Sequence, residues 1–198
     1  MMTPKKNERG KILLQIARTA ISHTLHVPFS AAIPFDKEAA WLTQAGATFV
    51  TLTDRGQLRG CVGSLLACEP LIDDVSSNAI SAALRDTRFP PLTEEELDDI
   101  SVEVSLLSEL QPLDFVNEQD AITKLCPGID GIVFEYGTHR STFLPQVWKS
   151  LPQPQLFLRE LKTKAGLPED FWADNVRLSR YTVNKWREAD FSKEYANG

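Results

Sequence analysis

The spacing of hydrophobic and polar residues changes along the chain, and the changes predict where its helices and strands lie. Apolar residues recur at helical spacing from Arg9 to His26, which predicts an amphipathic helix. A period of two with β-branched residues follows at 49–53, and a second such run returns at 58–64. The segment between them, 54–57, carries a glycine where a turn needs positive φ, so we expect a β-hairpin.

Residues 100–106 alternate most regularly, with apolar side chains at every second position, and predict a half-buried strand. The remaining patterns predict helices at 69–85, 93–99, 117–125 and 154–165, strands at 131–136, 140–144 and 176–186, and a helical turn from Pro145. The predicted fold class is therefore α+β, a largely antiparallel sheet with packed helices. We expect one domain over 10–187, a flexible lead-in at 1–9 and a polar tail at 188–198.

The net charge and its distribution along the chain limit the kinds of partner that the protein could bind. The chain has 198 residues and a formal net charge of −6, which argues against a nucleic-acid binder and against docking on an anionic membrane. Residues 89–123 carry ten acidic side chains and no lysine or arginine, whereas 140–187 is rich in basic residues. We favour two solvated faces; the alternative is a basic rim that steers an anionic ligand or an acidic partner.

The cysteine and histidine positions predict no metal site. Cys61, Cys68 and Cys126 match no zinc-ribbon or redox spacing, and His23 and His26 have no further ligands at a matching distance. Phosphate-loop and dinucleotide motifs are absent, so no cofactor is predicted. The charged start of the chain is no signal peptide, and no apolar run approaches the roughly 20 residues that span a bilayer. We expect a cytoplasmic protein with reduced thiols.

The stretch Leu58-Arg59-Gly60-Cys61-Val62-Gly63 concentrates the candidate chemistry. In a regular strand Leu58 and Val62 would face the core, while Arg59 and Cys61 would share the opposite face. Gly60 and Gly63 bare the backbone for a ligand, a bulge or another strand.

Two readings of this stretch remain open. Arg59 either anchors a carboxylate or phosphate, or pairs internally with an acid; Glu103 on the alternating strand is the expected partner and a tentative acid or base. Cys61 is either a nucleophile favoured by the nearby guanidinium or, as we prefer, a small structural side chain. Arg88 is a candidate second cation beside this stretch, and Gln146 is a candidate ligand-binding neighbour of the same residues.

The order of several segments resembles a known family. The six-residue stretch is followed by Arg88-Phe89-Pro90-Pro91, by Glu103-Val104-Ser105 and by Phe143-Leu144-Pro145-Gln146-Val147-Trp148. In that order they resemble the AMMECR-one domain family, also called AmmeMemoRadiSam system protein A. The resemblance covers roughly Gly10 to Trp186. His139, in a segment that departs from the family pattern, takes no role from it.

The resemblance implies a larger and a smaller lobe with a cleft at the Arg-Gly-Cys segment, but it implies no settled reaction. Bacterial members often accompany a Memo-type protein and a radical-SAM protein. The resemblance therefore favours an accessory module that acts with such partners. The alternative is an enzyme or binder of a small anionic ligand.

Overall fold

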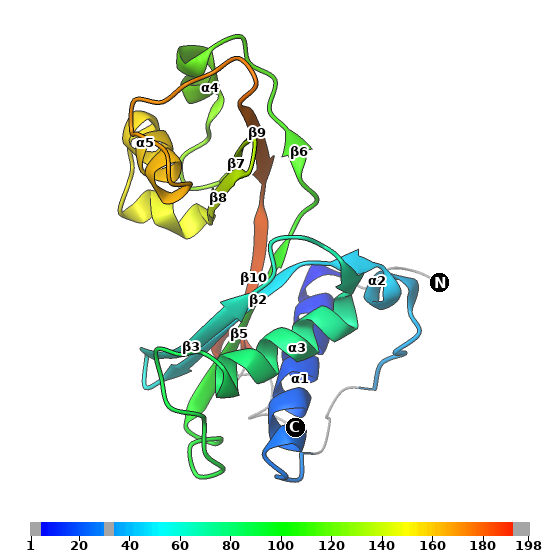
Figure 1. Cartoon of the computed structure of the whole chain (residues 1–198). Coiled ribbons are helices and arrows are strands. Elements are labelled where there is room, and N and C mark those ends of the chain that lie inside the picture. The colour runs from blue at the N-terminus through cyan, green and yellow to red at the C-terminus, as the bar shows by residue number, and fades with distance from the viewer. Residues whose placement is uncertain (1–4, 30–33, 192–198) are drawn as a thin grey trace. The chain divides into compact units, whose positions relative to one another are not determined.

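The computed structural model of the chain describes residues 5–29 and 34–191, which fold into two compact units (Figure 1). The first unit runs to Leu107 and resumes at Asn184; the second comprises Ser108–Val183. Helices and antiparallel strand pairs occur in both, which confirms the α+β class. The cleft between two lobes and the single domain over 10–187 stay predictions.

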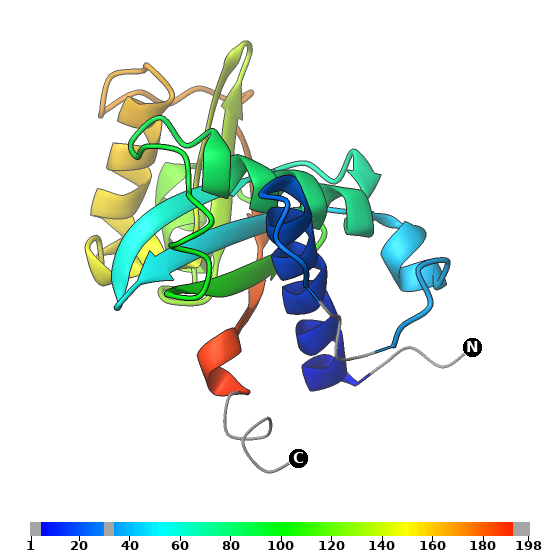
Figure 2. The ribbon, with the colours of Figure 1, turned by 90° about the horizontal axis from the view of Figure 1, so that it is seen from below.

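A four-stranded sheet in the order β10-β5-β2-β3 forms the base of the first unit. Its strands are β2 (Thr48–Asp54), β3 (Gln57–Gly63), β5 (Ile100–Leu107) and β10 (Val183–Arg187). The helices α1 (Lys6–Thr24) and α3 (Leu71–Leu84) pack against each other on one face of this sheet (Figures 1 and 2). The smaller elements are α2 (Ala40–Thr43), the strand pair β1 (Ala45–Gly46) and β4 (Glu69–Pro70), and the 3-10 turn η2 (Glu188–Asp190).

The alternation in the sequence decides which face of the sheet the helices cover. Val50 and Leu52 of β2 and Val102 and Val104 of β5 are fully buried in the core that α1 and α3 also build. The residues between them therefore project from the opposite face, which we call the helix-free face. Thr51 is one of these residues, so the candidate residues on neighbouring strands can be placed relative to it.

The second unit also contains a four-stranded sheet, in the order β6-β9-β7-β8. Its elements are β6 (Gln111–Pro112), α4 (Glu118–Lys124), β7 (Gly131–Tyr136), β8 (His139–Phe143), the 3-10 turn η1 (Pro145–Lys149), α5 (Pro154–Lys164) and β9 (Arg177–Tyr181). Helix α5 packs on β8 and buries Phe157, Leu158 and Leu161. The Trp148 ring stacks on Phe157 with centroids 3.7 Å apart, so Trp148 is a core residue.

Three sequence predictions differ from the structure. The first helix begins at Lys6, inside the predicted lead-in, of which 1–4 lie outside the described residues; 192–198 of the predicted tail do so as well. Residues 94–99 form turns, where a helix was predicted at 93–99. The predicted strand 176–186 is two strands, β9 and β10, which belong to different sheets.

The hairpin and the alternating strand are confirmed. Among the described residues, no helix combines the length and apolar character that crossing a bilayer requires.

Candidate functional site

A β-bulge in strand β3 sets the direction of the Arg-Gly-Cys segment. Leu52 of β2 lies opposite Gly60, but the next residue, Thr53, lies opposite Leu58, so Arg59 has no partner of its own on β2. An extra residue of this kind resets the alternation of side chains along its strand. Leu58 is accordingly 43% exposed, and its predicted place in the core is wrong.

The guanidinium of Arg59 is bound within the first unit. It donates to both carboxylate oxygens of Glu96, at 2.8 and 3.0 Å, and to the carbonyl of Pro90 at 3.0 Å. Its side chain is only 12% exposed. The hydrogen bonds that Arg59 donates lower the pKa of Glu96 from 4.5 to about 2, and the same interaction raises the pKa of Arg59. Arg59 therefore ties the edge strand to the 90–96 segment.

Glu103 does not pair with Arg59, which corrects the sequence prediction. Strand β2 lies between the two, and Glu103 is opposite Thr51 rather than opposite a residue of β3. The Glu103 carboxylate instead accepts hydrogen bonds from β10, from Arg187 at 2.6 Å, and forms an ion pair with Lys185 at 2.7 Å. Together with the Arg88–Asp86 pair, these ion pairs occupy the acid and the cations on which the anion-binding hypothesis relied.

The pair between Arg88 and Asp86 closes the open edge of β3 at Cys61. Asp86 accepts the Cys61 backbone N–H at 2.8 Å, while Arg88 donates to the Cys61 carbonyl at 3.2 Å. Arg88 also donates to both oxygens of Asp86, at 2.9 and 2.6 Å. The Arg88 hydrogen bond holds the pKa of the Asp86 carboxyl far below its usual range. The pair replaces the missing neighbour strand at this position.

The thiol of Cys61 lies on the helix-free face and is half-buried and free. Thr51, directly opposite, donates its hydroxyl to the Cys61 Sγ at 3.3 Å. Because Thr51 also lies opposite Glu103, the residues Cys61, Thr51 and Glu103 form one row across three strands. We call this row the thiol row. It brings together Cys61 and Glu103, with Thr51 between them.

Both glycines of the segment have internal neighbours. A Cβ on Gly60 would lie 2.1 Å from the carbonyl oxygen of Ala82 in α3, and one on Gly63 would lie 2.3 Å from the Phe49 ring. The bare backbone therefore lets α3 and Phe49 approach the strand. This explains both glycines without a ligand.

Gln146 lies on η1 in the second unit and is exposed. Its grouping with the residues of β3 stays a prediction. His139, to which no role was assigned, bonds through Nδ1 to the Ala165 carbonyl at 2.9 Å at the end of α5. Across residues 5–29 and 34–191, no three His, Cys, Asp or Glu side chains gather as a metal site would require.

Sequence reasoning missed a buried polar cluster beside the site. Asp74 and Asn78 of α3 are almost fully buried and hold the start of β2. Asp74 accepts from the backbone N–H and the hydroxyl of Thr48, at 2.8 and 2.6 Å, and Asn78 donates to the Thr48 carbonyl. Their spacing of four, next to the buried Val75 and Ala79, was a signal for this inward face.

Comparison with known proteins identifies the family. The AMMECR1 family model matches residues 14–186, a span that includes most of both units. The chain belongs to the AMMECR1 family. A Methanothermobacter thermautotrophicus protein is 38% identical over 191 residues, which cover 93% of this chain and 97% of that protein. A Thermotoga maritima protein is 40% identical over 153 residues, covering 76% and 82%.

A solved structure supports the AMMECR1 fold. The crystal structure of an uncharacterized protein from Pyrococcus horikoshii matches with a TM-score of 0.76 and 31% identity, over 91% of this chain and 92% of that one. The AMMECR1 assignment confirms the resemblance inferred from the segment order. It adds no reaction, because none of these relatives' names states one.

Proposed function

We propose that this AMMECR1-type protein is an accessory interaction module that acts with Memo-type and radical-SAM proteins. The observation that carries the proposal is the internal pairing of its expected anion-binding cations. Arg59 is held by Glu96 and Arg88 by Asp86, so both serve to bind the 86–96 segment to β3. A substrate anion would have to displace these carboxylates first.

The thiol row is the proposed docking position. It lies on the sheet face that no helix of the first unit covers, and its Cys61 and Thr51 side chains are half-buried and uncharged. Interface cores are depleted of charged residues, and neutral side chains on a sheet suit such a core. The class of partner follows from the resemblance of the chain to AmmeMemoRadiSam system protein A.

Binding to the two purified partners tests this proposal. Wild-type protein should bind at least one of them, and Thr51→Arg should weaken that binding at least about tenfold by placing a charge in the interface core. Ser77→Arg, which adds the same side chain to an exposed position of α3, should have no effect. Circular dichroism checks that both variants fold. Equal binding by Thr51→Arg and wild type would contradict the proposed surface, and no binding of either partner would contradict the function.

The hydrogen bond between Thr51 and Cys61 favours a second candidate function, thiol chemistry at Cys61. A hydroxyl that donates to sulfur stabilises the negative charge that a nucleophilic thiolate carries. Cys68 and Cys126, both exposed and free, provide an internal reference. If Cys61 is a nucleophile, iodoacetamide should alkylate it at pH 7 faster than Cys126, and Thr51→Val should remove the difference. Slower alkylation of Cys61 would eliminate this candidate.

A further inference from the structure

Four aromatic side chains lie at the boundary of the core of the second unit. The Phe115 ring lies 5.5 Å from that of Trp172, and the Tyr136 ring lies 4.7 Å from that of Phe171, centroid to centroid. Phe171 and Trp172 are adjacent in sequence, so the two ring pairs are joined. All four side chains pack against buried residues of this core but are partly exposed. We call these four residues the aromatic edge.

Backbone hydrogen bonds fix the loop that carries half of the aromatic edge. The Phe171 N–H donates to the Pro168 carbonyl, and the Val176 N–H donates to the Ala173 carbonyl, both at 3.1 Å. Two turns therefore hold the loop on either side of its aromatic pair. A surface that is already ordered loses little conformational entropy when a partner binds to it.

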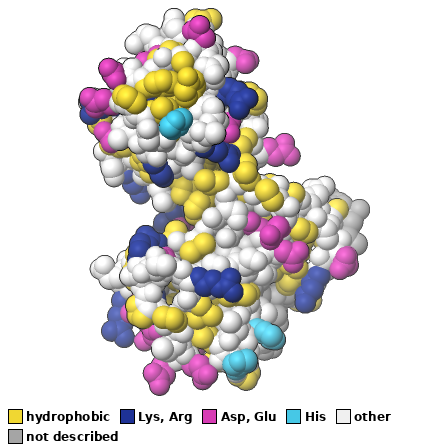
Figure 3. Space-filling view, viewed as in Figure 1, with side chains coloured by type: hydrophobic (Ala, Val, Ile, Leu, Met, Phe, Trp, Pro, Cys, Tyr) yellow, Lys and Arg dark blue, Asp and Glu magenta, His cyan; other side chains and the backbone are white. Residues whose placement is uncertain are grey.

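The surface beside the aromatic edge is also apolar. Val116, the neighbour of Phe115, is 86% exposed, and the His139 ring stacks with Tyr136 at 6.4 Å. Figure 3 shows a hydrophobic area next to the one histidine of the second unit. Aromatic residues are enriched at the centres of protein interfaces, and exposed apolar surface bounded by polar residues marks many binding sites.

Three acidic side chains adjoin the aromatic edge. Asp114 precedes Phe115, and Asp170 and Asp174 stand at the two ends of the segment that contains Phe171 and Trp172. All three acidic residues are exposed. Within residues 5–29 and 34–191, no lysine or arginine forms an ion pair with their carboxylates. The charge beside the exposed rings is therefore negative.

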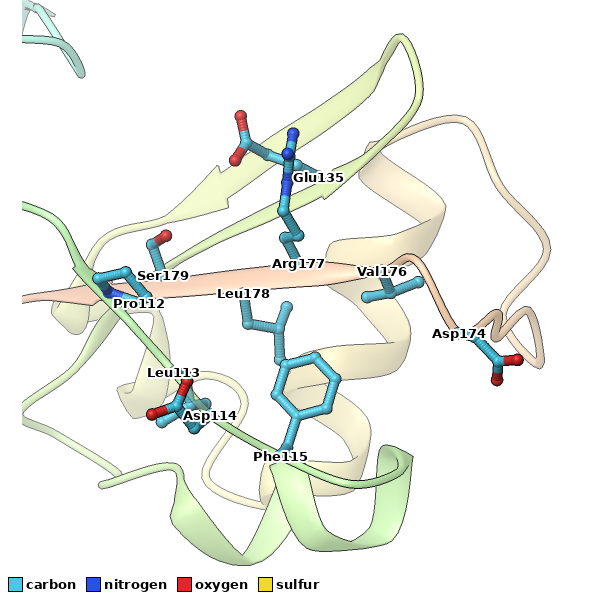
Figure 4. Close-up of a pocket in the computed structure, with 10 residues that line it drawn as sticks. All are labelled: Pro112, Leu113, Asp114, Phe115, Glu135, Asp174, Val176, Arg177, Leu178 and Ser179. Carbon is cyan, nitrogen blue, oxygen red and sulfur yellow. The ribbon is translucent and has the colours of Figure 1, made fainter.

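The basic side chains nearby are bound elsewhere. Three are already in ion pairs, which are Lys124–Asp120, Arg159–Glu169 and Lys162–Glu118. Arg177 lies opposite Glu135 of β7, and Figure 4 shows it on the other side of β9 from Phe115. The carboxylates of Asp114 and Asp174 are directed away from Arg177 in the same view. The three aspartates thus remain available to a partner.

We propose that the aromatic edge binds a basic segment of a protein partner, one that carries apolar side chains beside its lysines or arginines. The apolar side chains pack on the aromatic rings and on Val116, while the cations pair with the three aspartates or lie over the rings. Repulsion between like charges excludes an acidic segment. The aromatic edge belongs to the second unit and the thiol row to the first, so this inference does not rest on the proposed function.

Fluorescence anisotropy of a labelled hexapeptide of alternating lysine and leucine, titrated with the full chain, is the direct test. The wild type should bind it at least about tenfold more tightly than the hexapeptide in which glutamate replaces lysine. Replacing leucine by serine should also weaken binding at least about tenfold. Raising the salt from about 50 mM to about 500 mM should weaken it further, because the ion pairs are exposed. Absence of binding, or equal binding of the glutamate peptide, would overturn the proposal.

Variants locate the binding. The double variant Asp170→Lys/Asp174→Lys should weaken binding of the lysine–leucine peptide at least about tenfold, since repulsion replaces two ion pairs. Glu95→Lys/Asp98→Lys makes the same change in net charge at exposed positions of the first unit and should bind as the wild type does. Equal losses in the two double variants would reveal an effect of net charge alone and refute the site.

Trp172→Leu tests the aromatic contribution separately. It keeps an apolar side chain but removes the ring, so binding of the lysine–leucine peptide should weaken about two- to fivefold, the factor that one exposed cation–π contact supplies. Circular dichroism checks that this variant and both double variants fold. Unchanged binding by folded Trp172→Leu would contradict the part assigned to the rings.

Discussion

Replacing Gly60 by alanine should destabilise the first unit strongly, because the structure leaves no room for one methyl group. The added Cβ would lie 2.1 Å from the Ala82 carbonyl oxygen and 3.0 Å from the Ala82 carbonyl carbon. Both obstacles are backbone atoms of α3, so no side-chain rotation can relieve the contact. Strand and helix would have to separate by about 1 Å, and the packing of Val75 and Ala79 would loosen with them.

The expected cost follows from two opposing effects. Overpacking of a close-packed core usually costs about 1–3 kcal/mol, and a backbone obstacle places Gly60→Ala at or above the upper end. Removing a glycine from the unfolded chain returns about 0.4–1 kcal/mol. We therefore expect a net loss of about 2–3 kcal/mol, which lowers the urea midpoint by roughly 1 M when the slope is about 2 kcal/mol per M.

Urea unfolding followed by circular dichroism measures this loss, and hydrogen exchange of the β3 amides should place it in the first unit. Cys61→Ala is the matched control, since Cys61 adjoins Gly60 on the same strand but faces away from α3; its midpoint should shift far less. A Gly60→Ala midpoint equal to that of the wild type would refute the close approach of α3. It would also restore Gly60 as a position kept bare for an external ligand.

Four further substitutions test three ion pairs. The pKa of Glu96 is lowered from 4.5 to about 2, so its contribution to stability is complete above pH 4.5 and is lost as the pH falls to about 2. The urea midpoint of Glu96→Gln should therefore lie below that of the wild type at pH 7, and the difference should shrink at pH 3. At pH 7 we expect a cost of about 1 kcal/mol, after allowance for the 37% exposed side chain of Glu96. Asp86→Asn removes the charge that holds Arg88, and thermal unfolding at pH 7 should show a loss of about 1–2 kcal/mol. Lys162 is 2% exposed and bound to Glu118 at 2.7 Å. In chemical unfolding, the free energy of unfolding of Lys162→Met should be within about 1 kcal/mol of the wild-type value. Glu118→Gln should lose more stability, because it leaves the ammonium group of Lys162 buried and unpaired.

Local sequence patterns predicted the secondary structure correctly where it depends on residues that are close in sequence. The strand at 100–106 was predicted because its alternation matches a sheet with one buried face, and β5 has that burial. The hairpin was predicted because a glycine sits where the turn needs positive φ; Gly56 has φ of 81° and Arg55, before it, 48°. In both cases the deciding interactions span only a few residues.

The prediction at 176–186 was wrong because alternation does not say which sheet a strand joins. Leu178 is buried in the second unit and Trp186 in the first, and β9 and β10 meet at Thr182. Gly10 is the distant counterpart of Trp186: a Cβ there would lie 2.3 Å from the indole ring. That fit links residues far apart in sequence, so no local window contains it.

The choice of partner for Arg59 shows the same limit within the candidate site. Opposite charges on neighbouring strands suggested Glu103, but the bulge leaves Arg59 without a position in the ladder between β3 and β2. Its guanidinium reaches the turn at Glu96, and Glu103 is left to β10. The bulge therefore separates the cation from the thiol that the sequence motif places two residues away. Any chemistry of this motif must therefore come from Cys61 and the hydroxyl of Thr51 opposite it. The guanidinium of Arg59 is already bound to Glu96 and to the Pro90 carbonyl at the edge of the sheet.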